Sequence, residues 1–154
     1  MIKYLGVSAC LLGQKVRYDG NHKQDPSLAR LYGRDVTFIP ICPEVEAGLG
    51  IPREPLRLEG DVAAPRAMTM YTRQDLTDLL TTHARKRLAD LATLNLQGFV
   101  FMSRSPSCGL DSVPVLQEQG QVVLGRGIFA QACARCFPGL PMLEVGQKPQ
   151  SAPP

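Results

Sequence analysis

The chain has 154 residues, of which 44% are hydrophobic and 20% are charged, and these values are ordinary for a globular domain with a hydrophobic core. Its formal charge of +3 at pH 7 is too small to predict binding to long nucleic acid, although a small anionic ligand would be tolerated. Because no segment approaches the ~18 apolar residues of a membrane span, we expect a protein that does not cross a membrane.

The N-terminal segment 2–7 is apolar and β-prone, and we interpret it as a first strand that leads into Cys10. The residues VSAC that end at this cysteine resemble a lipoprotein processing site. However, only nine residues precede Cys10 and Lys3 interrupts them, which leaves too little room for the apolar region of a signal peptide. We therefore expect a cytoplasmic protein.

The next part of the chain contains a helix, a strand and an irregular segment. Asp25 and Pro26 favour the start of a short helix that ends near residue 32. The apolar segment 36–41 predicts a second strand. Residues 52–67 are rich in proline, glycine and charge, and we interpret them as an ordered surface loop with the character of a lid.

The second half of the chain begins with a long helical pattern. Thr72 and Asp75 resemble a capping box, with Asp in place of Glu, that would open a helix running to about residue 96. Leucine and alanine recur along this segment at the helical period and form one apolar stripe. Beyond it we expect strands over 98–102, 121–124 and 143–145, and a helix over 126–137.

Strands that alternate with helices predict an α/β fold. We expect a single small domain over residues 1–146, with a mostly parallel sheet and helices on both faces, in the manner of Rossmann-like or flavodoxin-like domains. Residues 147–154 are expected to form a flexible C-terminal tail.

The chain contains five cysteines, an odd number that argues against a disulfide framework and favours metal, cluster or redox chemistry. Three of them, Cys10, Cys42 and Cys108, come shortly after predicted strands. Because ligands of open α/β sheets bind beyond the carboxyl ends of the strands, we expect these three thiols to meet at one place.

Three thiolates without a fourth protein ligand suit a zinc site with an open position or an iron–sulfur cluster with one iron that no residue binds. Spacing alone does not separate these sites from three unrelated buried cysteines. The remaining pair, Cys133 and Cys136, forms a C-x₂-C pattern that could be a redox pair or half of a metal site. No strand precedes it, and it lies inside a predicted helix.

Candidate acid–base groups stand beside two of the three cysteines. Glu44 follows Cys42 in Cys-Pro-Glu, where the proline fixes the backbone, so its carboxylate could carry protons from a defined place. Ser103, Ser105 and Ser107 in SRSPSCG could donate hydrogen bonds to a cluster or a substrate, or could serve the turn alone.

Two further groups are candidates for substrate binding. Arg17, Tyr18 and Asp19 follow the first strand, where Tyr18 could stack on a ring and Asp19 could accept from ring N–H groups, or where the chain could simply turn. Arg53 and Arg57 in PREPLR could bind a phosphate in bidentate fashion, or could merely solvate a loop.

Three segments taken together, SACLLGQKVRYDG, CPEVEAGLGIPREPLRL and SRSPSCG, resemble the bacterial thiouracil desulfurase family over about residues 2–140. The resemblance implies a small α/β protein that holds a [4Fe–4S] cluster on Cys10, Cys42 and Cys108 and removes sulfur from thiolated uracils. The substrate sulfur would bind the fourth iron, and water would replace that sulfur at the ring carbon.

The same resemblance implies roles for other residues. Glu44 would be the proton-transfer group and Ser105 the catalytic serine, with Ser103 as the nearby alternative. The substrate would be a small thiolated pyrimidine, either a base or a nucleotide. Two alternatives remain: an electron-transfer or binding protein with a fully ligated cluster, using Cys133 or Cys136, and a zinc-structured domain.

Overall fold

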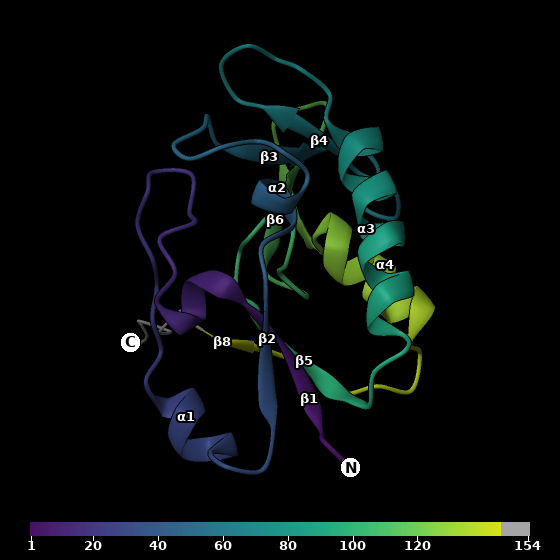
Figure 1. The fold of residues 1–154 in the computed structure, drawn as a ribbon. Coiled ribbons are helices and arrows are strands. Elements are labelled where there is room, and N and C mark those ends of the chain that lie inside the picture. The colour runs from purple at the N-terminus through teal and green to yellow at the C-terminus, as the bar shows by residue number, and fades with distance from the viewer. Residues whose placement is uncertain (146–154) are drawn as a thin grey trace, which may run out of the picture.

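The computed structural model describes residues 1–145, which form two four-stranded sheets (Figure 1). The central sheet contains β1 (Tyr4–Ser8), β2 (Thr37–Ile41), β5 (Leu96–Met102) and β8 (Met142–Val145). Its strand order is β2-β1-β5-β8, and every neighbouring pair is parallel. The expected α/β fold with a mostly parallel sheet is therefore confirmed.

Helices cover both faces of the central sheet, as expected. Along β5, Phe99 and Phe101 pack with α3 (Thr77–Leu91) and α4 (Ile128–Cys136) in one apolar cluster. The alternate residues Val100 and Met102 belong to a second cluster that includes Leu28 of α1 (Ser27–Tyr32). This alternation is the period of two that a strand buried on both faces requires.

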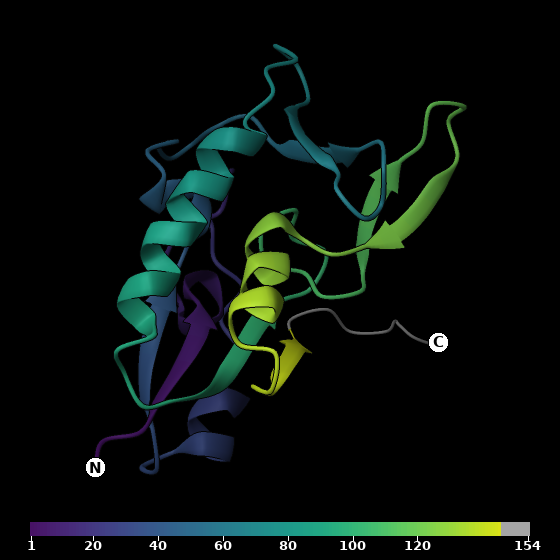
Figure 2. The same ribbon diagram turned by 90° about the vertical axis from the view of Figure 1, so that its right-hand side faces the viewer.

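The second sheet lies beyond the carboxyl ends of β1 and β2 in Figure 1, and Figure 2 shows its two hairpins projecting from the body of the molecule. It contains β3 (Leu56–Glu59), β4 (Arg66–Thr69), β6 (Val113–Leu116) and β7 (Val122–Gly125). Both hairpins are antiparallel, while β3 and β6 pair in parallel. Leu58 and Val115 pack against Leu80 of α3, which attaches this sheet to the rest of the fold.

The interpretation of residues 52–67 as a loop was wrong, because β3 and the start of β4 lie within it. Leu56 and Leu58 are buried and alternate with Arg57 and Glu59, a strand pattern that four residues between prolines and glycines barely display. Strand β6 was missed for a related reason. It contains Pro114, and proline normally argues against a paired strand.

The long helix α3 is shorter than predicted, and the capping box does not form. Thr72 instead donates its hydroxyl to Glu54, while Asp75 accepts a hydrogen bond of 3.0 Å from the backbone N–H of Thr77. The helix therefore begins at Thr77 and ends at Leu91, and the chain turns into β5 by residue 96. Its apolar stripe is confirmed by the buried residues Leu80, Ala84, Leu88 and Leu91.

Two short elements position the ends of the first strands. A 3₁₀ turn, η1 (Ala9–Leu12), follows β1, and a four-residue helix, α2 (Pro43–Glu46), follows β2.

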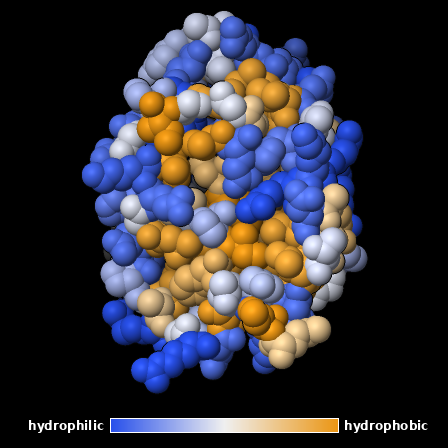
Figure 3. Space-filling model, viewed as in Figure 1, coloured by the Kyte–Doolittle hydropathy of each residue, from blue (hydrophilic) through white to orange (hydrophobic). Residues whose placement is uncertain are grey.

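Hydrophobic residues gather in the middle of the face seen in Figure 3, with hydrophilic residues around its margin. No helix within residues 1–145 is long and apolar enough to cross a membrane. The predicted tail, 147–154, lies outside the described residues.

Candidate functional site

One pocket of about 360 Å³ brings together residues from the carboxyl ends of three adjacent strands. Cys10 lies in η1 after β1, Cys42 directly follows β2, and Cys108 lies in the loop after β5. All three cysteines line the pocket. The structure thus places the three thiols where the positions of the strand ends predict them.

Burial makes these thiols unfavourable as free thiolates. It raises the pKa of Cys10 to about 11 and also raises the pKa of Cys42. The pKa of Cys108 is also raised, and burial is the largest cause. A hydrogen bond with the Ser8 side chain lowers this pKa, and the neighbouring Cys10 and Cys42 raise it. Three thiolates in one pocket would repel one another, and a bound metal centre would offset their negative charge.

Zinc and an iron–sulfur cluster bind cysteine ligands in different ways. Among residues 1–145, no three His, Cys, Asp or Glu side chains gather closely enough to hold a single metal ion. A zinc ion draws its thiolates to about 2.3 Å from one centre, whereas the cysteines of a [4Fe–4S] cluster bind separate irons. The three cysteines that line the pocket are the residues that would hold such a cluster.

A buried carboxylate, Glu44, stands beside the thiols in the first turn of α2, and its side chain is 11% exposed. Its Oε1 accepts a hydrogen bond of 2.9 Å from Nε of Arg53, and its Oε2 accepts one of 2.9 Å from the hydroxyl of Ser107. Because each oxygen has its own donor, the carboxylate is held in one orientation at the wall of the pocket.

The three serines of SRSPSCG have three different surroundings. Ser105 Oγ accepts hydrogen bonds from the backbone N–H groups of Ser107 and Cys108, at 3.2 and 3.0 Å, so it shapes the turn. Ser107 donates to Glu44. Ser103 lines the pocket, and its buried hydroxyl has no hydrogen-bond partner among the described residues. It is therefore the only serine of this motif whose hydroxyl has no hydrogen-bond partner in the described part of the chain.

The loop after β1 contributes two of its three predicted residues. Arg17 and Tyr18 line the pocket, and the guanidinium carbon of Arg17 lies 5.9 Å from the centre of the Tyr18 ring. The buried Nε of Arg17 has no partner within residues 1–145. Asp19 is exposed, is absent from the lining of the described pocket and accepts a hydrogen bond from Asn21 within a turn.

The two arginines of PREPLR have different positions. Arg53 lines the pocket and is bonded to the protein through all three of its side-chain nitrogens. Arg57 lies on β3, pairs with Glu59 and is not among the described residues that line the pocket.

Two exposed cations at the pocket, Lys23 and Arg104, were not predicted. Arg104 has a backbone φ of 63°, and its N–H donates to the hydroxyl of Ser112. Its position within SRSPSCG was a signal that sequence reasoning could have used. Lys23 offered no such signal.

The backbone of Cys42 is fixed by a residue that sequence reasoning also missed. Glu46 accepts a hydrogen bond of 3.0 Å from the N–H of Cys42 and pairs with His83 of α3 at 2.8 Å. In the loop that carries Cys108, the N–H of Leu110 and the hydroxyl of Ser112 donate hydrogen bonds to Glu144 of β8. Carboxylates thus fix the loops that carry Cys42 and Cys108 to neighbouring elements.

Comparisons with known proteins identify the family of this chain. The sequence model of the 2-thiouracil desulfurase family matches residues 5–144. The chain belongs to the 2-thiouracil desulfurase family. The family membership expected from the three motifs is therefore confirmed.

Two relatives resemble this desulfurase family member over most of its length. An uncharacterized protein of Bacillus subtilis (strain 168), YbbK, is 30% identical over 129 residues, which are 80% of this chain and 85% of that protein. The solved structure of the [4Fe-4S]-dependent thiouracil desulfidase TudS is 28% identical, with a TM-score of 0.75. That match covers 96% of this chain and 94% of the other.

The second cysteine pair of this family member lies away from the site. Cys133 is fully buried on α4 within the apolar core, and this burial raises the pKa of its thiol far above the ordinary value. Cys136 is exposed at the end of the same helix. Neither is among the residues that line the pocket in the described part of the chain. Their positions argue against a role as a fourth ligand.

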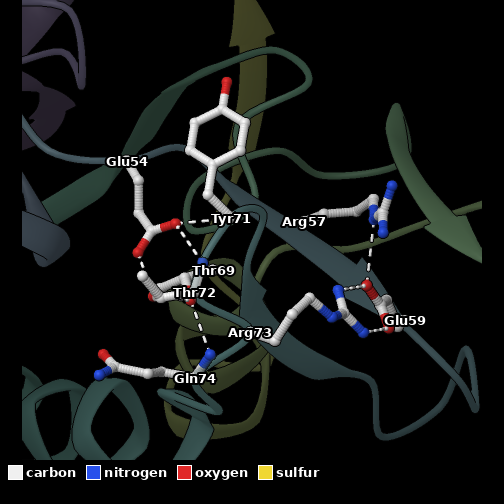
Figure 4. A network of polar contacts seen from close by, with 8 residues as sticks. All are labelled: Glu54, Arg57, Glu59, Thr69, Tyr71, Thr72, Arg73 and Gln74. Atoms are coloured by element: carbon white, nitrogen blue, oxygen red, sulfur yellow. Dashed lines mark hydrogen bonds and ion pairs between the residues drawn. The ribbon is translucent and has the colours of Figure 1, made fainter.

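A polar network fixes the hairpin that contributes Pro55 and Leu56 to the pocket (Figure 4). Glu54 accepts hydrogen bonds from the N–H groups of Tyr71 and Thr72 at 2.8 and 3.0 Å. Further along the hairpin, Arg73 donates to both oxygens of Glu59 at 2.6 and 2.8 Å, and Arg57 donates to one of them. These contacts hold β3 against the turn that follows β4.

Proposed function

We propose that this protein is a [4Fe–4S]-dependent thiouracil desulfurase that converts thiouracil and water to uracil and sulfide. The observation that carries the proposal is a pocket lined both by three cysteines from adjacent strand ends and by Glu44, whose two carboxylate oxygens are each hydrogen-bonded. Membership of the family and the likeness to TudS support the substrate class and the cofactor. The residue roles below are inferred from the site.

In this proposal Cys10, Cys42 and Cys108 hold the cluster through their thiolates. The positions of Cys133 and Cys136 outside the described pocket support a cluster in which one iron has no protein ligand. When bound, such a cluster supplies a soft Lewis acid that suits the soft sulfur of a thiocarbonyl group.

Glu44 is the proton-transfer group of the reaction. Water adds its oxygen to the ring carbon, the carbon–sulfur bond breaks, and the protons of the water end on the departing sulfide, so no electrons are gained or lost. Glu44 takes a proton from the water and returns it as the sulfide leaves. Arg53 and Ser107 hold the carboxylate in place for both transfers.

Ser103 is the serine that contacts the substrate. Ser103 lines the pocket, and its buried hydroxyl has no hydrogen-bond partner among residues 1–145, which supports this role. Ser105 positions Cys108 through its bond to the backbone of that residue. We therefore assign the substrate contact to Ser103, although the family resemblance favours Ser105 and gives Ser103 only as the alternative.

Cationic side chains at the pocket bear on the form of the substrate. Arg17, Lys23 and Arg104 line it together with the ring of Tyr18. A pyrimidine base suits the aromatic ring, and a phosphate on a nucleotide suits the cations. Both the thiolated base and its nucleotide are therefore substrates to test.

The substitution Glu44→Gln tests the proposal, because glutamine keeps the shape of the side chain and its bond from Arg53 but cannot take the proton. We expect the iron content to stay at the wild-type level and the rate of uracil formation to fall by about 10²–10⁴-fold. Glu118→Gln, a matched change at an exposed turn, should leave both unchanged. Normal turnover in Glu44→Gln would refute the role of Glu44.

Experiments on the unmodified protein test the proposed reaction itself rather than the role of Glu44. A wild-type protein that binds its iron but releases no uracil would favour the electron-transfer or binding alternative. A colourless protein with stoichiometric zinc would favour the zinc-structured domain.

A further inference from the structure

Arg53 lines the pocket, but its side chain is only 9% exposed and is fully engaged with the protein. Nε donates to Oε1 of Glu44, Nη1 donates to the carbonyl of Gly50, and Nη2 donates to the carbonyl of Val16. Each of these three contacts is 2.9 Å long. The guanidinium is therefore held at all three of its nitrogens.

The acceptors of Arg53 belong to separate loops of the site. Val16 precedes the pocket residues Arg17 and Tyr18 in the segment between η1 and α1, and Glu44 lies in α2, the short helix after β2. The thiol of Cys42 approaches the same Val16 carbonyl at 3.8 Å. The guanidinium of Arg53 thus connects the Glu44 carboxylate to the carbonyl of Val16, the atom that the thiol of Cys42 also contacts.

The backbone of Arg53 adds a fourth tie, because its N–H donates to the carbonyl of Tyr18 at 2.9 Å. Lysine could not replace these contacts. Its ammonium is a single point charge, whereas the acceptors of Arg53 lie around a planar fork with three separate nitrogens.

We propose that Arg53 is a positioning residue, which fixes the Glu44 carboxylate and the loop at Val16–Tyr18 relative to Cys42 and does not bind the substrate. This replaces the expectation that Arg53 binds a phosphate. The inference rests on the proposed function, because the orientation of Glu44 matters to the rate only if Glu44 transfers the proton.

Steady-state kinetics of the iron-loaded Arg53→Gln protein with two substrates separate the two roles. The substrates are 2-thiouracil and its nucleoside 5′-monophosphate. A positioning role predicts that kcat falls by about 10²-fold for both substrates while KM stays near the wild-type value, since misplacing a catalytic group slows the chemical step. A rise in KM for the nucleotide alone, with the kinetics of the free base unchanged, would overturn the proposal.

Arg53→Lys keeps the positive charge, and it addresses the case in which Arg53→Gln does not fold. A positioning role predicts that kcat falls in this variant as well, because the three-way contact is lost. Wild-type kinetics in Arg53→Lys would show that charge alone suffices and would overturn the proposal. Arg57→Gln is the matched control, since Arg57 lies in the same motif and pairs with Glu59 on β3.

Hydrogen exchange provides a readout that does not depend on turnover. In the iron-loaded protein, amide exchange over residues 14–20 should rise in Arg53→Gln and stay at the wild-type level in Arg57→Gln. Unchanged exchange in Arg53→Gln would overturn the proposal even if the unmodified protein proved inactive on both substrates. Inactivity of the unmodified protein by itself would overturn the proposed function alone.

Discussion

A single added methyl group at Gly127 should disrupt the loop that carries Cys108. A Cβ built on Gly127 would lie 2.5 and 2.6 Å from the carbonyl carbon and oxygen of Ser107, and 2.8 Å from the nitrogen of Cys108. All three atoms belong to the backbone, so no side chain can rotate away. The loop would have to move away by about 0.9 Å to bring the carbonyl carbon of Ser107 to an ordinary van der Waals distance of 3.4 Å from this Cβ.

Hydrogen bonds on both sides of Gly127 resist this movement. Its own N–H donates to the carbonyl of Gly109 at 2.8 Å, and the N–H groups of Phe129 and Ala130 donate to the carbonyl of Ser107. The backbone of Gly127 has φ −66° and ψ 159°, which alanine adopts without strain. The cost of Gly127→Ala therefore comes from the contact alone, and overpacking of this kind costs about 1–3 kcal/mol.

Urea denaturation and iron analysis of Gly127→Ala and Gly139→Ala, compared with the wild type, measure this effect. Gly139 is the matched control because a Cβ there would meet nothing within 4 Å. We expect Gly127→Ala to lose about 1–3 kcal/mol of unfolding free energy and to retain less iron, while Gly139→Ala keeps its iron. Equal stability and equal iron content in the two variants would refute the close packing of α4 on the Cys108 loop.

Two further predictions follow from other contacts. Hydrogen bonds from Arg73 hold the pKa of Glu59 at about 2, below its ordinary 4.5, so this stabilisation is complete above pH 4.5 and is lost as the pH falls toward 2. The side chain of Arg73 is 48% exposed, so solvent weakens this contribution. Acid unfolding of Arg73→Gln should show a smaller pH dependence than that of the wild type, and equal slopes would contradict this prediction. Cys108→Ser should lose iron while Cys136→Ser keeps it, as measured by iron content after anaerobic reconstitution, and iron loss in Cys136→Ser would assign that exposed cysteine to the site.

The central sheet could be predicted because its strands are long apolar segments that end in recognisable loops. Segments 2–7, 36–41 and 98–102 supply β1, β2 and β5, whose adjacent carboxyl ends bring the three cysteines to one pocket. Of the second sheet, segment 121–124 predicted β7. The other three strands, β3, β4 and β6, could not be predicted, because they have four residues each and contain Pro114 or lie among prolines and glycines. Tertiary packing of Leu58 and Val115 under α3 stabilises them instead.

The composition of the site could be predicted more readily than the contacts within it. Glu44 was identified because it follows Cys42 in Cys-Pro-Glu, but its partners Arg53 and Ser107 lie nine and 63 residues away in the sequence. No local pattern encodes such a contact. The availability of Ser103 over Ser105 likewise depends on which hydroxyl the folded turn uses, and only the three-dimensional structure distinguishes them.

Anaerobic purification with iron and sulfide analysis, followed by addition of 2-thiouracil, tests most directly whether Cys10, Cys42 and Cys108 form a catalytic cluster site. We expect about four irons per chain and conversion of 2-thiouracil to uracil and sulfide. A protein that binds no iron under strictly anaerobic conditions, or one that binds a full cluster and converts no thiolated uracil, would contradict the proposed function.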